Sequence, residues 1–206
     1  MTFKKAIQIL KKDKVFNELI LPCNDKVQAR FDTLGNNDDL YLSLLRSIVS
    51  QQLSTKAANT IFGRFLDLFP NKYPIAALII ATKDEQLRAV GLSFQKISYI
   101  KAVAQYSLTN NLSLAHINQL SNDEIIAELT TIKGVGKWTV EMILIFGLKR
   151  LDVFPYDDLI IKNGIIKRYN ITSKGKQLKA DCYQIAEKWK PYRSVASLFL
   201  WESKVL

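Results

Sequence analysis

The chain has 206 residues, enough for one domain or two small lobes around a hydrophobic core, and its 48% hydrophobic and 23% charged residues are typical of a globular protein. The longest apolar runs are too short to span a membrane, and one histidine with two widely separated cysteines argues against a histidine triad or a zinc cluster. The net charge of +10 favours a polyanionic partner.

Helical periodicity runs through almost the whole chain, and no segment alternates convincingly as a strand does. Two capping boxes, at residues 82–85 and 121–124, open helices, and Gly91 would end the first of them. Further helices are predicted over residues 40–49, 54–69, 74–81, 93–106, 138–148, 158–169, 177–189 and 191–201. Short connections join them, with a basic loop at residues 172–176, so we expect an all-α fold.

Residues 132–136 (IKGVG) form a tight glycine loop between two helical patterns, which predicts a helix-hairpin-helix. Gly134 and Gly136 can adopt positive φ and carry no Cβ, so backbone N–H groups can approach a phosphate closely. The N-terminus of the next helix and the amine of Lys137 add positive charge. Such contacts hold a duplex without reading its sequence. The alternative is a plain turn between two packed helices.

Basic residues are concentrated around this loop. Residues 133–176 contain nine lysines and arginines against four acids, so half of the net charge of +10 lies in about a fifth of the chain. A solvated basic face would have the same composition. Its position beside the glycine loop favours nucleic acid as the partner.

A proline turn at residues 155–158 (PYDD) places two acids at the start of a helix. Neighbouring helical residues point about 100° apart, so Asp157 and Asp158 cannot both face one cleft. Either can serve as the N-cap of the helix. A single carboxylate facing a cleft suits cleavage of an N-glycosidic bond, because it stabilises the oxocarbenium-like sugar and orients the attacking water.

The aromatic and basic residues near these motifs allow two interpretations. Trp138 and Trp201 can stack on a flipped base, or they can belong to the core, and periodicity does not separate the two. Arg193 and Ser194 follow Pro191 in the first turn of the last helix, where they can be structural or can face DNA.

Four segments in this order resemble the helix-hairpin-helix DNA glycosylases, and within them the 3-methyladenine DNA glycosylase II branch. They are residues 47–54 (SIVSQQLS), 132–139 (IKGVGKWT), 152–159 (DVFPYDDL) and 189–194 (WKPYRS). The resemblance implies a two-lobed, all-α HhH-GPD fold with the active site in the cleft between the lobes. Residues 1–206 would form one catalytic unit, with a helical lobe at 40–130 and a hairpin-containing lobe at 131–206 on which residues 1–39 pack.

The resemblance also assigns roles to individual residues. The family's catalytic aspartate falls on Asp158, and the residue that fills the gap left by the flipped base falls on Gln52. The base pocket falls on Trp138, Trp201 and Met142, the last being a tyrosine in some relatives. The residues expected to bind DNA are Gln51, Gln52, Lys133, Gly134, Val135, Gly136 and Lys137.

The same resemblance bears on cofactors and on strand cleavage. In relatives, the hairpin carbonyls that correspond to Thr130, Ile132 and Val135 can hold a monovalent cation, Na⁺ or K⁺. The four-cysteine motif of the iron–sulfur members is missing, so we expect no iron–sulfur cluster and no other cofactor. Members that also cut the strand carry a nucleophilic lysine where this chain has Trp138. We therefore expect a monofunctional enzyme.

The activity implied is that of a hydrolase which removes alkylated purines, of the 3-methyladenine and 7-methylguanine type, from double-stranded DNA in base excision repair. Two alternatives remain: a helix-hairpin-helix glycosylase for another base lesion, and a non-catalytic helix-hairpin-helix DNA-binding module. We expect a monomer that does not bind membranes. With no apolar signal segment at its N-terminus, it should stay inside the cell with the DNA.

Overall fold

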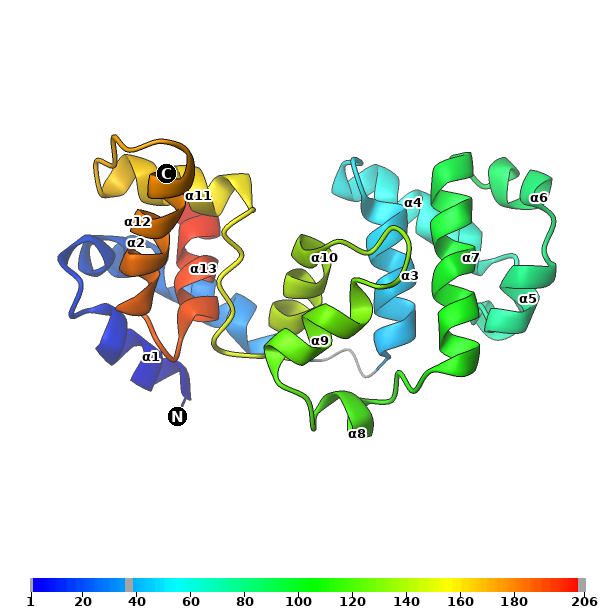
Figure 1. The fold of residues 1–206 in the computed structure, drawn as a ribbon, viewed down its shortest axis with the longest axis horizontal. Helices are drawn as coiled ribbons and strands as arrows, with labels where there is room; N and C mark the ends of the chain where they lie inside the picture. The colour runs from blue at the N-terminus through cyan, green and yellow to red at the C-terminus, as the bar shows by residue number, and fades with distance from the viewer. Residues whose placement is uncertain (1, 36–38, 204–206) are drawn as a thin grey trace. The chain divides into compact units, whose positions relative to one another are not determined.

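All regular structure in the computed structural model, which describes residues 2–35 and 39–203, is helical, as the sequence predicted. The chain divides into two compact units (Figure 1). Unit 1 joins Met1–Asn36 to Leu144–Leu206, and unit 2 is Asn37–Ile143. None of the described helices combines the length and the apolar character that crossing a membrane requires.

Unit 1 combines an N-terminal and a C-terminal part of the chain. Its helices are α1 (Thr2–Leu10), α2 (Lys14–Asp32), α11 (Leu159–Arg168), α12 (Gly175–Glu187) and α13 (Arg193–Glu202). The blue helices α1 and α2 pack on the red helix α13, which also contacts α11 (Figure 1). The apolar faces of these helices enclose the fully buried Phe16, Trp189 and Phe199, and their burial is the main stabilising contribution to this unit.

Unit 2 is built around the long helix α7, which packs against α3 and α5. Its elements are α3 (Leu40–Ser50), α4 (Thr55–Leu66), the 3₁₀ turn η1 (Pro70–Lys72), α5 (Ala76–Ala81), α6 (Asp84–Ala89), α7 (Phe94–Thr109), α8 (Leu114–Ile117), α9 (Asn122–Leu129) and α10 (Lys137–Met142). The helix predicted at residues 40–49 forms as α3 and buries its apolar face, with Leu44, Leu45 and Ile48 fully buried.

The predicted helix at 138–148 consists of two parts. The α-helix α10 ends at Met142 and continues as a π-helix, η2 (Ile143–Gly147). The boundary between the units falls inside this π-helix, between Ile143 and Leu144. Short π segments inside helices often occur at functional sites.

The boundary corrects the predicted lobes, because the hairpin at 131–143 belongs to unit 2 and not to a lobe at 131–206. The reason is tertiary: α10 packs on α9, Gln51 bonds to the carbonyl of Gly134, and Lys133 bonds to Ser98 of α7. These contacts hold the hairpin to the helices that precede it in the chain.

Two local predictions also change. The capping box at 121–124 is confirmed, with Ser121 as N-cap and Glu124 as its partner. The box predicted at 82–85 does not form: the N-cap of α6 is Lys83, whose side chain cannot accept a cap bond, and only its N–H donates to the side chain of Gln86. The basic loop at 172–176 is shorter than predicted, because α12 already begins at Gly175.

Candidate functional site

The glycine loop forms the predicted hairpin between α9 and α10, and its two glycines have different roles. The N–H of Val135 donates to the carbonyl of Ile132 at 3.0 Å and closes the turn. Gly134 has φ +91° and lies on the ring of Tyr99, so an added Cβ would be 2.2 Å from Tyr99 Cγ. Gly136 has φ −91°, and an added Cβ would meet nothing within 4 Å. Only Gly134 therefore requires glycine for its conformation and its space.

The hairpin borders a surface hollow of about 730 Å³ in unit 2. The hollow collects most of the residues predicted to touch DNA, and it also includes residues of α7 that the sequence did not single out. Its lining consists of Gln51, Gln52, Ser93, Gln95, Lys96, Tyr99, Thr130, Thr131, Ile132, Lys133, Gly134, Val135, Gly136, Trp138 and Thr139. The structure thus brings residues from the three segments 51–52, 93–99 and 130–139 to one surface.

Lys137 and Met142 belong to α10 but do not line the hollow. Lys137 is exposed, and its Nζ lies 3.5 Å from Oε1 of Glu141, one turn further along the helix. Glu141 is only 3% exposed, and this buried carboxylate had no signal in the sequence beyond its i, i+4 spacing from a lysine. Met142 is half-buried.

The turn after α3 carries Gln52, the residue predicted to enter the DNA, with φ +58°. Two side chains hold the last turn of α3 and the turn that follows it. Lys96 Nζ of α7 donates to the carbonyl of Val49 at 2.7 Å, and Gln51 Nε2 donates to the carbonyl of Gly134 at 3.1 Å. Partial burial lowers the pKa of Lys96. Gln51 therefore ties the turn to the hairpin, and its direct contact with DNA stays a prediction.

The two tryptophans of the predicted base pocket lie in different units. Trp138 is 44% exposed, so the interpretation of this indole as a core residue is wrong. Trp201 is partly buried in unit 1. Its ring centroid lies 5.3 Å from that of Phe146, and the Arg30 guanidinium carbon lies 5.7 Å from the Trp201 ring centroid. Their joint role in holding a base stays a prediction.

Asp158 is the N-cap of α11. Its Oδ1 accepts hydrogen bonds from the N–H groups of Ile160 at 2.9 Å and Ile161 at 3.1 Å, and its own N–H donates to the carbonyl of Pro155 at 3.0 Å. Asp158 is 8% exposed, whereas Asp157 is exposed. The cap that the sequence allowed for either acid thus falls on Asp158, and it fixes the direction of this carboxylate.

No group of three or more His, Cys, Asp or Glu side chains that could hold a metal ion occurs within residues 2–35 and 39–203. Cys23 and Cys182 are both buried in unit 1, and burial raises the pKa of each thiol. Thr130, Ile132 and Val135 lie together in the hairpin, and a monovalent cation on their carbonyls stays a prediction.

A family model and two curated relatives match this chain. The model of the HhH-GPD superfamily base excision DNA repair proteins matches residues 45–191. DNA-3-methyladenine glycosylase 1 of Schizosaccharomyces pombe is 39% identical over 81% of this chain and 73% of that protein. The alkylbase DNA glycosidase-like protein mag2 of the same yeast is 34% identical over 79% of this chain and 76% of its own length.

A solved structure of a 3-methyladenine DNA glycosylase is also similar to this chain. The S. pombe 3-methyladenine DNA glycosylase Mag1, in complex with abasic DNA, superimposes with a TM-score of 0.81 at 34% identity. The match covers 98% of this chain and 97% of that one.

Proposed function

Because this chain belongs to the HhH-GPD superfamily of base excision DNA repair proteins, we propose that it is a DNA-3-methyladenine glycosylase that hydrolyses the N-glycosidic bond of alkylated purines. The observation that carries the proposal is Asp158, a carboxylate held at the N-terminus of α11 by two backbone N–H groups. Its substrate is double-stranded DNA that contains the alkylated base, and its product is an abasic site.

The reaction needs one carboxylate. As the bond between C1′ and the base nitrogen breaks, the sugar becomes oxocarbenium-like and the electron pair leaves with the base. The Asp158 carboxylate stabilises the developing positive charge and orients the water that attacks C1′. Since the two N–H groups fix its orientation, little reorganisation is needed at the moment of reaction.

DNA binding is assigned to the hairpin. The backbone N–H groups of its turn would hold a phosphate, and Lys133 supplies a positive charge at the same hollow. Gln52, in a left-handed conformation at the end of α3, would fill the space that the flipped base leaves. The hairpin contacts would recognise the backbone of the duplex rather than its sequence.

Substrate selection would rest on stacking. Methylation at N3 or N7 of a purine makes the base cationic and a better leaving group. The exposed indole of Trp138 offers a π face to such a ring, and cation–π attraction of this kind contributes about 0.5–2 kcal/mol. A methylated purine therefore suits this surface better than an unmodified one.

Chromatography of the bases released from methylated DNA tests the function directly. The wild-type protein should release free 3-methyladenine or 7-methylguanine, and untreated DNA serves as the control. Release of an oxidised or deaminated base instead would identify a glycosylase for another lesion. If no base is released while damaged duplex is still bound, the protein is a non-catalytic DNA-binding module.

Borohydride should trap no covalent protein–DNA adduct during turnover, because the position that carries the nucleophilic lysine in strand-cutting members is Trp138. The neighbouring Lys137 does have an amine, but its ammonium lies 3.5 Å from Glu141, and a protonated amine cannot attack C1′. Denaturing electrophoresis of lesion-containing duplex measures the result. An adduct that disappears in Lys137→Ala would show that this lysine does act as a nucleophile.

A further inference from the structure

The segment at residues 150–158 leads from the π-helix to α11 and delivers Asp158, yet it contains no helix of its own. At its start the N–H of Arg150 donates to the carbonyl of Leu144 at 2.8 Å. At its end the N–H of Tyr156 donates to the carbonyl of Phe154 and the N–H of Asp158 to that of Pro155. Asp158 is held at one end of the segment by its cap on α11, so its position also depends on how well the other end, the root at residues 150–153, is anchored.

The first turn of α13 holds the root of the segment through two residues, the buried Ser194 and the partly exposed Arg193. This serine is 1% exposed. Its Oγ donates to the carbonyl of Arg150 at 2.6 Å and accepts from the N–H of Val153 at 3.0 Å. Its own N–H donates to the carbonyl of Leu151 at 2.9 Å. One buried residue thus bonds to the backbone of three residues of the segment, Arg150, Leu151 and Val153.

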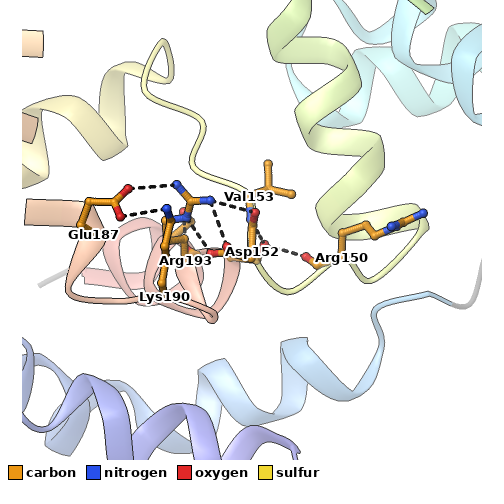
Figure 2. A network of polar contacts seen from close by, with 8 residues as sticks. Arg150, Asp152, Val153, Glu187, Lys190 and Arg193 are labelled. Atoms are coloured by element: carbon orange, nitrogen blue, oxygen red, sulfur yellow. Dashed lines mark hydrogen bonds and ion pairs between the residues drawn. The ribbon is translucent and has the colours of Figure 1, made fainter. Parts of the chain in front are cut away.

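Arg193 holds the segment through Asp152. Its Nε donates to Oδ1 of Asp152 at 2.6 Å and its Nη2 to Oδ2 at 3.0 Å, a two-point contact (Figure 2). The Arg193 side chain is 17% exposed. Such charge-assisted pairs fix geometry as well as add energy. In the same network, Nζ of Lys190 lies 2.8 Å from Oε2 of Glu187, and both of these side chains are about half exposed.

The same helix also contacts the element on the far side of Asp158. Helix α11 packs on α13, and a Cβ added to its Gly164 would lie 3.4 Å from Leu200 Cδ2 of α13. Contacts with α13 therefore hold both the chain before Asp158 and the helix after it. Whatever shifts the first turn of α13 shifts the root of the segment that carries Asp158.

We propose that Arg193 and Ser194 are positioning residues for Asp158: they hold residues 150–153 on α13 so that the carboxylate keeps its catalytic place. This inference rests on the proposed function, because it takes Asp158 as the catalytic group. It also favours the structural interpretation of this turn, since the Arg193 guanidinium pairs with Asp152 and lies 3.9 Å from Oε1 of Glu187.

The test compares Arg193→Lys with Lys190→Gln, a change at the exposed cation of the same network. Lysine keeps the charge but cannot form the two-point contact. Arg193→Lys should slow single-turnover base release by about tenfold to 100-fold, the effect expected of a displacement near 1 Å, while the Kd for abasic duplex stays within about twofold. Lys190→Gln should match the wild type in both. Asp152→Asn should reproduce the effect of Arg193→Lys, and the double variant should lose little more than either.

Amide hydrogen exchange gives a readout that does not require activity. The N–H groups of Val153 and Asp158 should exchange faster in Arg193→Lys and in Asp152→Asn than in Lys190→Gln. Unchanged exchange, or wild-type base release in Arg193→Lys, would overturn the inference. A loss of DNA affinity at an unchanged rate would make Arg193 a DNA contact instead. If the wild type released no methylated base, the proposed function would fail, and the exchange data would still decide whether Arg193 holds the segment.

Discussion

Asp158→Asn is expected to slow the release of methylated bases by about 1000-fold or more, while the protein stays folded and still binds damaged duplex. The reason is that the amide cannot stabilise the developing positive charge of the sugar or direct the attacking water as a carboxylate does. Single-turnover release of 3-methyladenine from methylated DNA measures the rate, and binding of an abasic duplex measures the affinity.

The substitution separates catalysis from capping. Oδ1 of Asp158 accepts the N–H groups of Ile160 and Ile161, and the side-chain oxygen of asparagine can accept the same two bonds. Asparagine and aspartate are about equally good N-caps, so the free energy of unfolding should change by less than about 0.5 kcal/mol. If Asp158 only capped α11, Asp158→Asn would keep its full activity.

Asp157→Asn is the matched control, because it makes the same chemical change on the neighbouring, exposed residue. It should retain nearly all activity and stability, since the cap of α11 is Asp158. The assignment of the catalytic group would be wrong if Asp157→Asn were the more damaging of the two in a folded protein.

Gly134→Ala is expected to weaken binding to every duplex, damaged or not, by about tenfold, which corresponds to about 1.4 kcal/mol. Alanine is strained at φ +91°, and its Cβ would lie 2.2 Å from the ring of Tyr99. The hairpin must move away from α7 to accept it, so its backbone N–H groups lose their positions around the phosphate. Fluorescence anisotropy with two unrelated duplex sequences measures the effect.

Gly136→Ala tests whether this loss is specific. Gly136 has φ −91°, and an added Cβ would meet no atom within 4 Å, so binding should stay within about twofold. A salt series adds a second check, because log Kd should change with log salt by about 0.9 per phosphate neutralised. Affinity that does not depend on salt, or wild-type affinity in Gly134→Ala, would remove the hairpin from the DNA interface.

The sequence by itself determined the features that depend on local order. Apolar residues at helical spacing predicted the all-α fold, because periodicity shows which face of a helix is buried. The two glycines predicted the hairpin, since a tight turn needs their freedom. The proline turn placed Asp158 at a helix start, where aspartate is a preferred cap. Each of these inferences uses residues within a few positions of one another.

Only the tertiary structure decided what covers those faces and holds those turns. Gln51 and Gly134 are 83 residues apart in the chain, and Arg193 and Asp152 are 41 apart. The hairpin belongs to unit 2, and Gly134 needs to be glycine while Gly136 does not, because Tyr99 lies under one of them. Periodicity identifies a buried face but carries no information about which distant segment packs on it, so these contacts follow only once the helices have packed.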